Sequence, residues 1–230
     1  MAKENVKKDE ERLESIETTL GKTEMFVENN KKTITAVVIA VVIVILAVFG
    51  IKKYYIDPRN EEAMAQMFRA EQFFAADDYA TALNGDGNNV GFLDIINNYG
   101  RTKSGNLARY YAGICYLNLG EFENAIKYLG EYKGKDEIVK PLAMGAMGDA
   151  YLELDNPAEA AKCYERAALE SKNSFTSPMM LMKAGYAYEM VENYEKALEM
   201  YNIIKKDYPS SNEAFNIEKN IAYVEAKLGR

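Results

Sequence analysis

Histidine and tryptophan are absent from the 230 residues, and there are only two cysteines. Without histidine the chain lacks the commonest general base and the commonest metal ligand. Two cysteines are too few to form a zinc site by themselves. The sequence also contains no paired nucleophile and base, and no glycine-rich phosphate loop between a strand and a helix. We therefore expect neither enzymatic activity nor a cofactor.

Positive charge is also in short supply. The chain has 28 Lys and Arg against 35 Asp and Glu, a net charge of −7. No global basic field therefore favours nucleic acid as a partner. Apart from one long apolar run, the composition is that of a globular protein, with 48% hydrophobic and 27% charged residues.

The long apolar run covers residues 34–51, ITAVVIAVVIVILAVFGI, and contains no charged residue. At ~1.5 Å per residue it spans roughly 27 Å, close to the thickness of a bilayer core. A buried core helix would have a polar face, which this run lacks. A cleaved signal peptide would have a shorter leading region and an Ala-x-Ala site after the run. The sequence therefore predicts an uncleaved transmembrane helix over 34–51.

Residues 1–33 form a charged tail in front of this predicted helix. Apolar residues recur there every seven positions, as a helix-pairing seam requires: Val6, Leu13, Leu20 and Val27. A marginal surface helix is the simpler interpretation, and we expect Gly21 to interrupt it. Three cations lie within 16–33 and four within 52–69, so the positive-inside rule does not choose an orientation.

Three copies of one pattern organise residues 106–209. The copies contain Gly113–Tyr116–Ala125, Gly148–Tyr151–Ala160 and Gly185–Tyr188–Ala197. Each marker moves by 35 and then by 37 residues between copies. A period in the middle thirties is typical of helical repeat arrays. The small Gly and Ala residues would let the two helices of a hairpin approach closely.

This pattern resembles the tetratricopeptide repeat (TPR), in which Gly-x-x-Tyr and a later Ala occur in the same order. The resemblance implies an all-α fold, a solenoid of helical hairpins behind the N-terminal transmembrane helix. We expect the solenoid domain to cover 57–230. It would comprise a degenerate repeat 60–105, repeats 106–140, 141–177 and 178–209, and a capping helix 210–228.

The degenerate repeat carries a turn-rich insertion, residues 84–89. We expect Asp57-Pro58 to end the membrane helix, and a second helix of this repeat to cover 91–98. Asn84, Asp86 and Asn88 alternate as calcium ligands do, but Asn89 stands where an EF-hand needs glycine. The insertion is therefore predicted to be a loop.

The capping helix 210–228 is expected to begin at Ser211. Its apolar stripe would consist of Phe215, Ile217, Ile221, Val224 and Leu228. We expect Cys115 and Cys163 to be free thiols at small buried positions. Asp149 and Glu153, four residues apart on a helix, are expected to be solvated surface charges.

In the TPR family the concave groove is lined mainly by positions 2, 5, 9, 12 and 13 of each first helix. By this resemblance, the candidate partner-binding residues are apolar: Met64, Met67, Phe74, Tyr110, Ile114, Leu117, Leu152, Met182, Tyr186 and Met190. The groove positions include no Lys or Arg, unlike TPR domains that clamp acidic chaperone tails. The alternative is that much of this stripe is core, covered by the insertion or by the last helix.

A short charged tail, one span and a C-terminal TPR domain resemble the YfgM-like family of ancillary subunits of the bacterial SecYEG translocon. The approach to the membrane, Met25-Phe26-Val27-Glu28-Asn29-Asn30-Lys31, is also similar. The resemblance implies a single-pass inner-membrane protein with a cytoplasmic N-terminus and a periplasmic TPR domain. It also implies partnership with the translocon, with a membrane-anchored prolyl isomerase chaperone and with unfolded polypeptide clients. The alternative function is a structural adaptor in an envelope assembly complex, without client binding.

Overall fold

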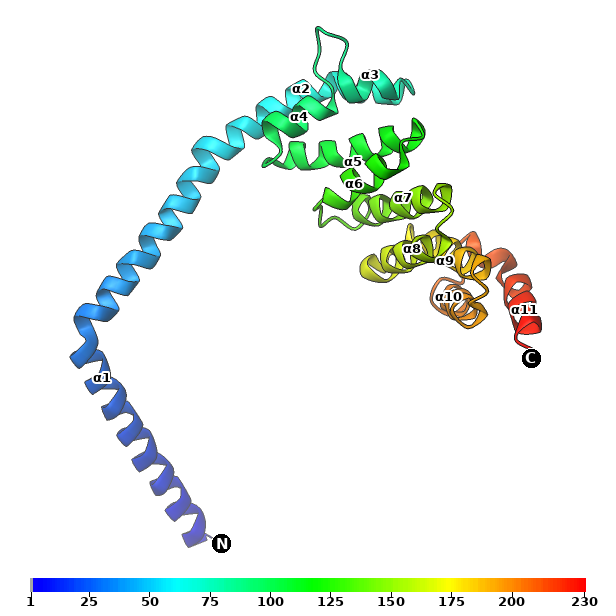
Figure 1. Cartoon of the computed structure of the whole chain (residues 1–230). Coiled ribbons are helices and arrows are strands. Elements are labelled where there is room, and N and C mark those ends of the chain that lie inside the picture. Colours follow the sequence, from blue (N-terminus) through cyan, green and yellow to red (C-terminus); the bar gives the residue numbers. More distant parts are fainter. Residues whose placement is uncertain (1) are drawn as a thin grey trace. The chain divides into compact units, whose positions relative to one another are not determined.

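The computed structural model describes the backbone of residues 2–230, and the side chains of 25, 28–170 and 172–230 (Figure 1). The described residues form helices joined by turns and loops, with no strand among them. They form two units, divided between Tyr55 and Ile56. The structure has two clusters of buried apolar residues, and all their members, including the half-buried ones, lie within residues 63–228. The second unit therefore has its own core.

The first unit consists mainly of one long helix, α1 (Ala2–Ile51). Its apolar residues from Val37 to Ile51 are exposed. A helical stretch, Glu28–Ala75, is long and apolar enough to cross a membrane, and its most apolar window has a mean hydropathy of 3.3. The expected interruption at Gly21 was wrong, because α1 continues through it. A single glycine costs a helix only about 1 kcal/mol, which good helix formers on both sides offset.

Asp57-Pro58 does not end the helical stretch, contrary to the prediction. A π-helical turn, η1 (Lys52–Ile56), leads directly into α2 (Asp57–Ala75). Proline lacks an N–H and its ring crowds the carbonyl four residues earlier, here that of Tyr54. That carbonyl lies in the wider π turn, and Pro58 occupies the first turn of α2, where an N–H is not needed.

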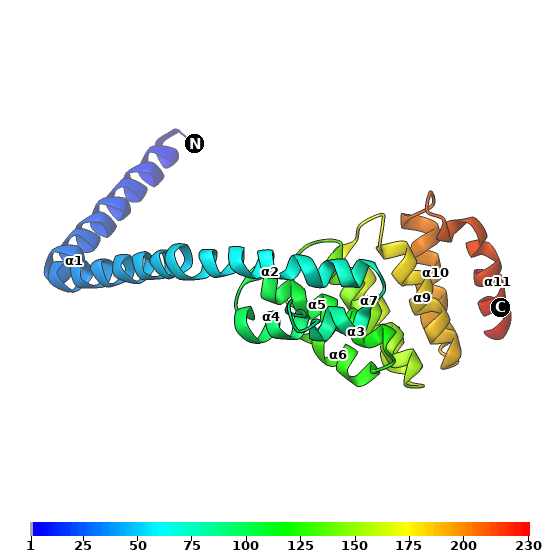
Figure 2. The ribbon, with the colours of Figure 1, turned by 90° about the horizontal axis from the view of Figure 1, so that it is seen from above.

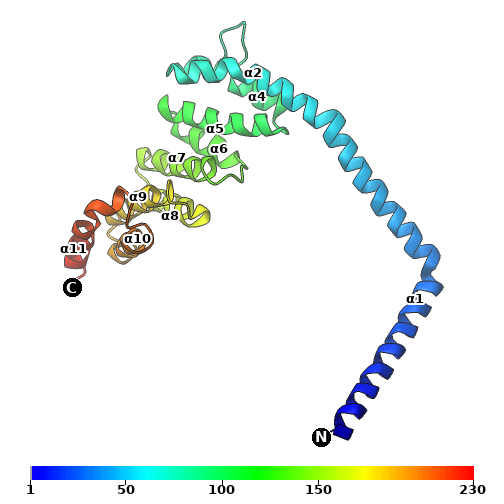
Figure 3. The ribbon, with the colours of Figure 1, turned by 180° about the vertical axis from the view of Figure 1, so that it is seen from behind.

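The second unit is a stack of helical hairpins (Figures 1 and 3). The hairpins α5–α6, α7–α8 and α9–α10 are each a pair of contacting helices, and α6 and α8 also pack against the first helix of the next hairpin. The bounds are α5 (Lys103–Asn118), α6 (Phe122–Glu131), α7 (Val139–Glu153), α8 (Pro157–Ser171), α9 (Ser177–Met190) and α10 (Tyr194–Asp207).

The three marker glycines lie where the helices of each hairpin touch. A Cβ atom added at Gly113, Gly148 or Gly185 would lie 2.4, 2.5 or 2.2 Å from the nearest side-chain atom of the facing helix. The facing residues are Leu129, Tyr164 and Tyr201, each four positions after the marker alanine. The predicted role of these glycines, close approach of two helices, is confirmed.

The turn inside each hairpin has the same backbone conformation. Seven residues after the marker glycine, the chain is left-handed: φ is 78° at Gly120, 54° at Asp155 and 56° at Glu192. The next N–H then bonds back to the carbonyl of the marker tyrosine, for example from Asn193 to Tyr188 at 2.9 Å. This is the Schellman arrangement, which satisfies carbonyls at a helix C-terminus.

The first hairpin is irregular because the insertion splits its second helix. The halves are α3 (Tyr79–Asn84) and α4 (Phe92–Tyr99), and both pack on α2 and α5. Phe92 and Ile95 are fully buried. In the loop between the halves, the Asp86 carboxylate accepts hydrogen bonds from the amides of Asn88 and Asn89. The polar residues of the insertion thus stabilise their own turn.

The C-terminal segment is shorter and more broken than the single helix expected over 210–228. It consists of a 3₁₀ turn, η2 (Glu213–Asn216), followed by α11 (Ile217–Lys227). Ile217, Ile221 and Val224 are buried as predicted, and α11 packs mainly on α10. Phe215 was wrongly assigned to the buried stripe, because η2 holds it outward in solvent.

Candidate functional site

The predicted groove residues lie on the four first helices α2, α5, α7 and α9, which are labelled in Figure 2. We refer to these ten residues as the first-helix stripe. Helix α2 contributes three, α5 three, α7 one and α9 three. The stripe residues are Met64, Met67 and Phe74, then Tyr110, Ile114 and Leu117, then Leu152, and lastly Met182, Tyr186 and Met190.

Three members of the stripe are exposed. Met64 on α2 is 59% exposed, and Tyr186 and Met190 on α9 are 51% and 61% exposed. An exposed methionine or tyrosine offers apolar area and adaptable shape to a partner. The two ends of the stripe are therefore its accessible parts.

Met67 belongs to the core, so its assignment to a binding surface was wrong, and Phe74 is half-buried against the same core. Met67 is only 3% exposed and lies in the main core cluster. Phe74 is surrounded by aromatic rings, with centroid distances of 5.6 Å to Tyr79, 6.3 Å to Phe92 and 5.1 Å to Tyr111. The split second helix brings Phe92 into this cluster, which sequence spacing did not reveal.

The central members of the stripe are half-buried. Tyr110 packs against Tyr111 and Tyr132, with ring centroids 5.6 Å and 6.0 Å away. Ile114 and Leu117 pack partly against the first core cluster, and Leu152 against the second. Burial raises the pKa of Tyr110 above its usual value.

The last helix reaches the stripe at its C-terminal end. The Asn220 side chain on α11 donates to the hydroxyl of Tyr186 at 3.3 Å and approaches the Met182 sulfur at 3.6 Å. Met182 is consequently half-buried. This agrees with the alternative that the last helix covers part of the stripe.

A polar network links α7, α8 and α9. The Lys183 ammonium on α9 lies 2.7 Å and 2.9 Å from the two Asp149 oxygens on α7, and the Tyr164 hydroxyl donates to Asp149 at 2.5 Å. Asp149, expected to be a solvated surface charge, is partly exposed but paired in this network, whereas Glu153 is exposed as expected. Burial and the bond to Asp149 raise the pKa of Tyr164 well above its usual value.

Sequence reasoning missed this network although a signal was present. Lys183 follows Asp149 by 34 residues, close to the repeat period, so the two lie at similar heights on successive first helices. Two similar contacts follow: the Tyr188 hydroxyl donates to Glu165, and the Tyr201 hydroxyl donates to Glu189. These bonds use the carboxylates to hold neighbouring helices together.

Both cysteines are free thiols, as predicted. Burial raises the pKa of Cys115 to about 12, and burial also raises the pKa of Cys163. A thiol is a nucleophile only as the thiolate, so neither cysteine is activated at neutral pH. Among the residues that the structure describes, no group of three or more Cys, Asp or Glu could hold a metal ion.

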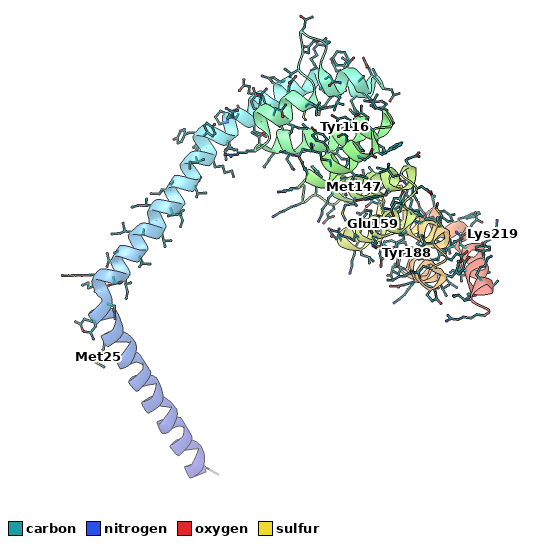
Figure 4. The ribbon with its side chains drawn as sticks, in the orientation of Figure 1. Met25, Tyr116, Met147, Glu159, Tyr188 and Lys219 are labelled. Carbon is teal, nitrogen blue, oxygen red and sulfur yellow. The ribbon has the colours of Figure 1, made fainter. Side chains whose placement is uncertain are left out.

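Two clefts in the described part of the chain are lined by residues outside the stripe. One of about 260 Å³ is lined by α6, α7 and α8 and includes Tyr132, Met147 and Cys163. The other, of about 250 Å³, is polar and includes Arg109 and Glu131, whose side chains form an ion pair at 3.5 Å. Figure 4 shows that Tyr116, Met147 and Tyr188 come from successive levels of the stack.

The comparisons with known proteins agree with this geometry. Residues 107–136 and 146–212 match two family models, both described as tetratricopeptide repeat. These two segments of the chain carry tetratricopeptide repeats. Among solved structures, a crystal structure of nearly identical TPR-like repeats of a kinesin light chain from Podospora anserina matches with a TM-score of 0.54. The match has 12% identity and covers 74% of this chain and 88% of that chain.

No curated protein matches the sequence. At 12% identity the solved structure is similar in fold alone, and its partners carry no information about this chain. TPR domains are in general protein-binding scaffolds rather than enzymes, because stacked hairpins present extended surfaces. The second unit of the chain is thus a TPR-like solenoid, a fold that in general binds protein partners.

Proposed function

We propose that the protein is a membrane-anchored, periplasmic TPR scaffold or chaperone that binds apolar polypeptide segments near the Sec translocon. The observation that carries the binding role is the exposure of Tyr186 and Met190 on one face of α9. Such side chains suit varied apolar partners. Met64 offers a second contact of the same kind at the other end of the stripe.

The partners in this proposal are the SecYEG translocon, a membrane-anchored prolyl isomerase chaperone and unfolded polypeptide clients. Support for them comes from the layout of tail, apolar span and TPR solenoid, and from the sequence that precedes the span. The second candidate is a structural adaptor in an envelope complex. The Asp149–Lys183 pair favours it, because a polar interruption suits a fixed interface better than a continuous apolar track.

Site-specific photocrosslinking in cells tests the binding role. A photoreactive residue at Tyr186 or Met190 should crosslink to a heterogeneous set of nascent or unfolded chains, and to translocon subunits. The matched control is Lys162 on α8, an exposed residue outside the stripe. One discrete product without client chains would instead support the adaptor. Equal crosslinking at Lys162 would contradict a role for the stripe.

The proposed topology has its own test. With the N-terminus in the cytoplasm and the solenoid in the periplasm, protease added to spheroplasts should degrade residues 57–230. The positive-inside rule does not choose this orientation, but long domains are translocated largely regardless of charge. Protection of the solenoid together with loss of the tail 1–33 would reverse the assignment.

A further inference from the structure

The two edges of the TPR solenoid differ in the charges they carry. One edge, here the turn edge, consists of the turns inside the hairpins, residues 76–78, 119–121, 154–156 and 191–193. These turns contain five acidic residues and no basic one: Asp77, Asp78, Glu121, Asp155 and Glu192. The other, the loop edge, consists of the loops between hairpins, 100–102, 132–138 and 172–176, and the segment 208–216 that includes η2.

The loop edge is where the cations gather. Arg101, Lys133, Lys135 and Lys172 lie in its loops, and Lys206 lies in the last turn of α10 beside it. All five side chains are exposed, and none forms an ion pair with a residue that the structure describes.

Three carboxylates share the loops of this edge, Asp136, Glu137 and Glu213, and the exposed Asp207 lies beside Lys206 in the last turn of α10. Asp136 is engaged within its own loop, where it accepts hydrogen bonds from the Tyr132 hydroxyl and from the amides of Ile138 and Val139. The loop edge is therefore mixed in charge and offers exposed cations that form no ion pair with a described residue, whereas the turn edge offers carboxylates alone.

Two aromatic side chains project from the loop edge. Phe215 is 87% exposed and Phe175 is 71% exposed, which makes them the most exposed large hydrophobic residues of the solenoid. Lys172 lies three positions before Phe175, and Lys206 lies nine before Phe215. Exposed phenylalanines beside lysines are the combination found on surfaces that enter a lipid headgroup layer.

The loop edge is continuous across the hairpins and includes the start of the solenoid. The Ser104 amide donates to the Asn60 side chain near the start of α2 at 2.9 Å, and the Lys133 amide donates to Asn106 at 3.0 Å. The Asn173 side chain donates to the Glu137 carbonyl at 2.8 Å, which joins the next two loops. Helix α2 begins on this edge, on the same side of the stack as loops 100–102 and 132–138 (Figure 1).

We propose that the loop edge is a second membrane contact, which docks on anionic lipid headgroups with Phe175 and Phe215 inserted. The predicted span ends at Ile51, only six residues before Asp57 opens α2 on this edge. A short tether of this kind keeps the edge at high effective concentration near the bilayer. Its cations would meet the negative surface potential, while the acidic turn edge would be repelled from it. The inference rests on the proposed membrane anchoring and is independent of what binds to the stripe.

The absence of tryptophan makes a specific test possible, because one introduced tryptophan is the only one in the chain. Single variants F175W, F215W and L154W of the full chain would be reconstituted into nanodiscs that contain dibrominated phosphatidylcholine and phosphatidylglycerol. Bromine quenches only tryptophan within the bilayer. We expect blue-shifted and strongly quenched emission at positions 175 and 215. Position 154, an exposed apolar residue on the turn edge, is the matched control and should remain unquenched.

Replacing phosphatidylglycerol by phosphatidylcholine should reduce the quenching at 175 and 215, since the lysines then lose their attraction. Unchanged quenching would overturn the role of the lysines. If the discs contain the anchored chain and quenching at 175 and 215 is no greater than at 154, the docking proposal is overturned. The anchoring is then left intact. Failure of the chain to enter discs would overturn the anchoring itself, and the docking with it.

Discussion

A Cβ atom added to Gly148 on α7 would lie 2.5 Å from Cε1 of Tyr164 on α8. The Tyr164 side chain is buried, and its hydroxyl is held by Asp149 at 2.5 Å. The ring therefore has no free space into which it can move. Any side chain at position 148 must push the two helices of this hairpin apart.

We expect Gly148→Val to lower the free energy of unfolding by roughly 1–3 kcal/mol through overpacking. The matched control is Gly130→Val on α6, where the nearest atom is the flexible end of Met147 at 3.7 Å. That change should stay within about 0.5 kcal/mol, as surface substitutions usually do. Urea denaturation of residues 56–230 measures both. Equal effects at the two positions would show that Gly148 has no special packing role.

The left-handed turn residues provide a second prediction. Glu192 has φ of 56°, a conformation that costs an L-residue roughly 1–2 kcal/mol and costs glycine nothing. Glycine loses more entropy on folding, so we expect Glu192→Gly to raise the free energy of unfolding by about 0.5–1 kcal/mol. Gly120→Ala, at the equivalent turn, should lower it by about 1 kcal/mol. Thermal melts measure both variants, and a melting temperature that moves in the same direction in both would contradict this reasoning.

Buried thiol and phenol groups should make the fold sensitive to alkali. Burial raises the pKa of Cys115 from 9.0 to about 12, and burial also raises the pKa of Tyr116. Below pH 9 these groups are protonated in both states, and their contribution to stability is fully present. Between pH 9 and 12 the unfolded thiol ionises while the folded one does not, so stability falls as pH rises.

Urea denaturation at increasing pH measures this loss. Cys115→Ala should make the decline above pH 9 less steep, because one group with a raised pKa is gone. Cys163→Ala is the control, since its half-buried thiol has the smaller pKa change. A slope unaffected by Cys115→Ala would mean that the thiol ionises equally in both states.

The exposed and buried members of the first-helix stripe should respond differently to a charge. Tyr186→Asp loses an edge-on contact with Tyr201 at 6.2 Å and the bond from Asn220, a loss of about 1 kcal/mol. The solenoid should remain folded, while crosslinking of apolar clients at Met190 should weaken. Met67→Asp should instead unfold the first hairpin, because it buries an unpaired carboxylate. Circular dichroism distinguishes the two; unfolding by Tyr186→Asp would place that residue in the core.

The hairpins of the solenoid followed from the sequence because the repeat is local. A glycine, a tyrosine three residues later and an alanine nine residues further determine which faces of two neighbouring helices meet. The same contact recurs at Gly113, Gly148 and Gly185, so three weak signals reinforced one another. The apolar segment 34–51 was equally evident, because hydrophobicity over a whole helix needs no tertiary partner to be recognised.

Only the tertiary structure decided which stripe residues are exposed. Met64 and Met67 are three positions apart on α2, yet one is exposed and the other is buried, because only the side of Met67 meets the core. Phe74 is half-buried because the insertion places α4 and its Phe92 beside α2. Asn220 reaches Met182 and Tyr186 from a separate helix. These contacts join residues far apart in the chain, and spacing within one repeat carries no information about them.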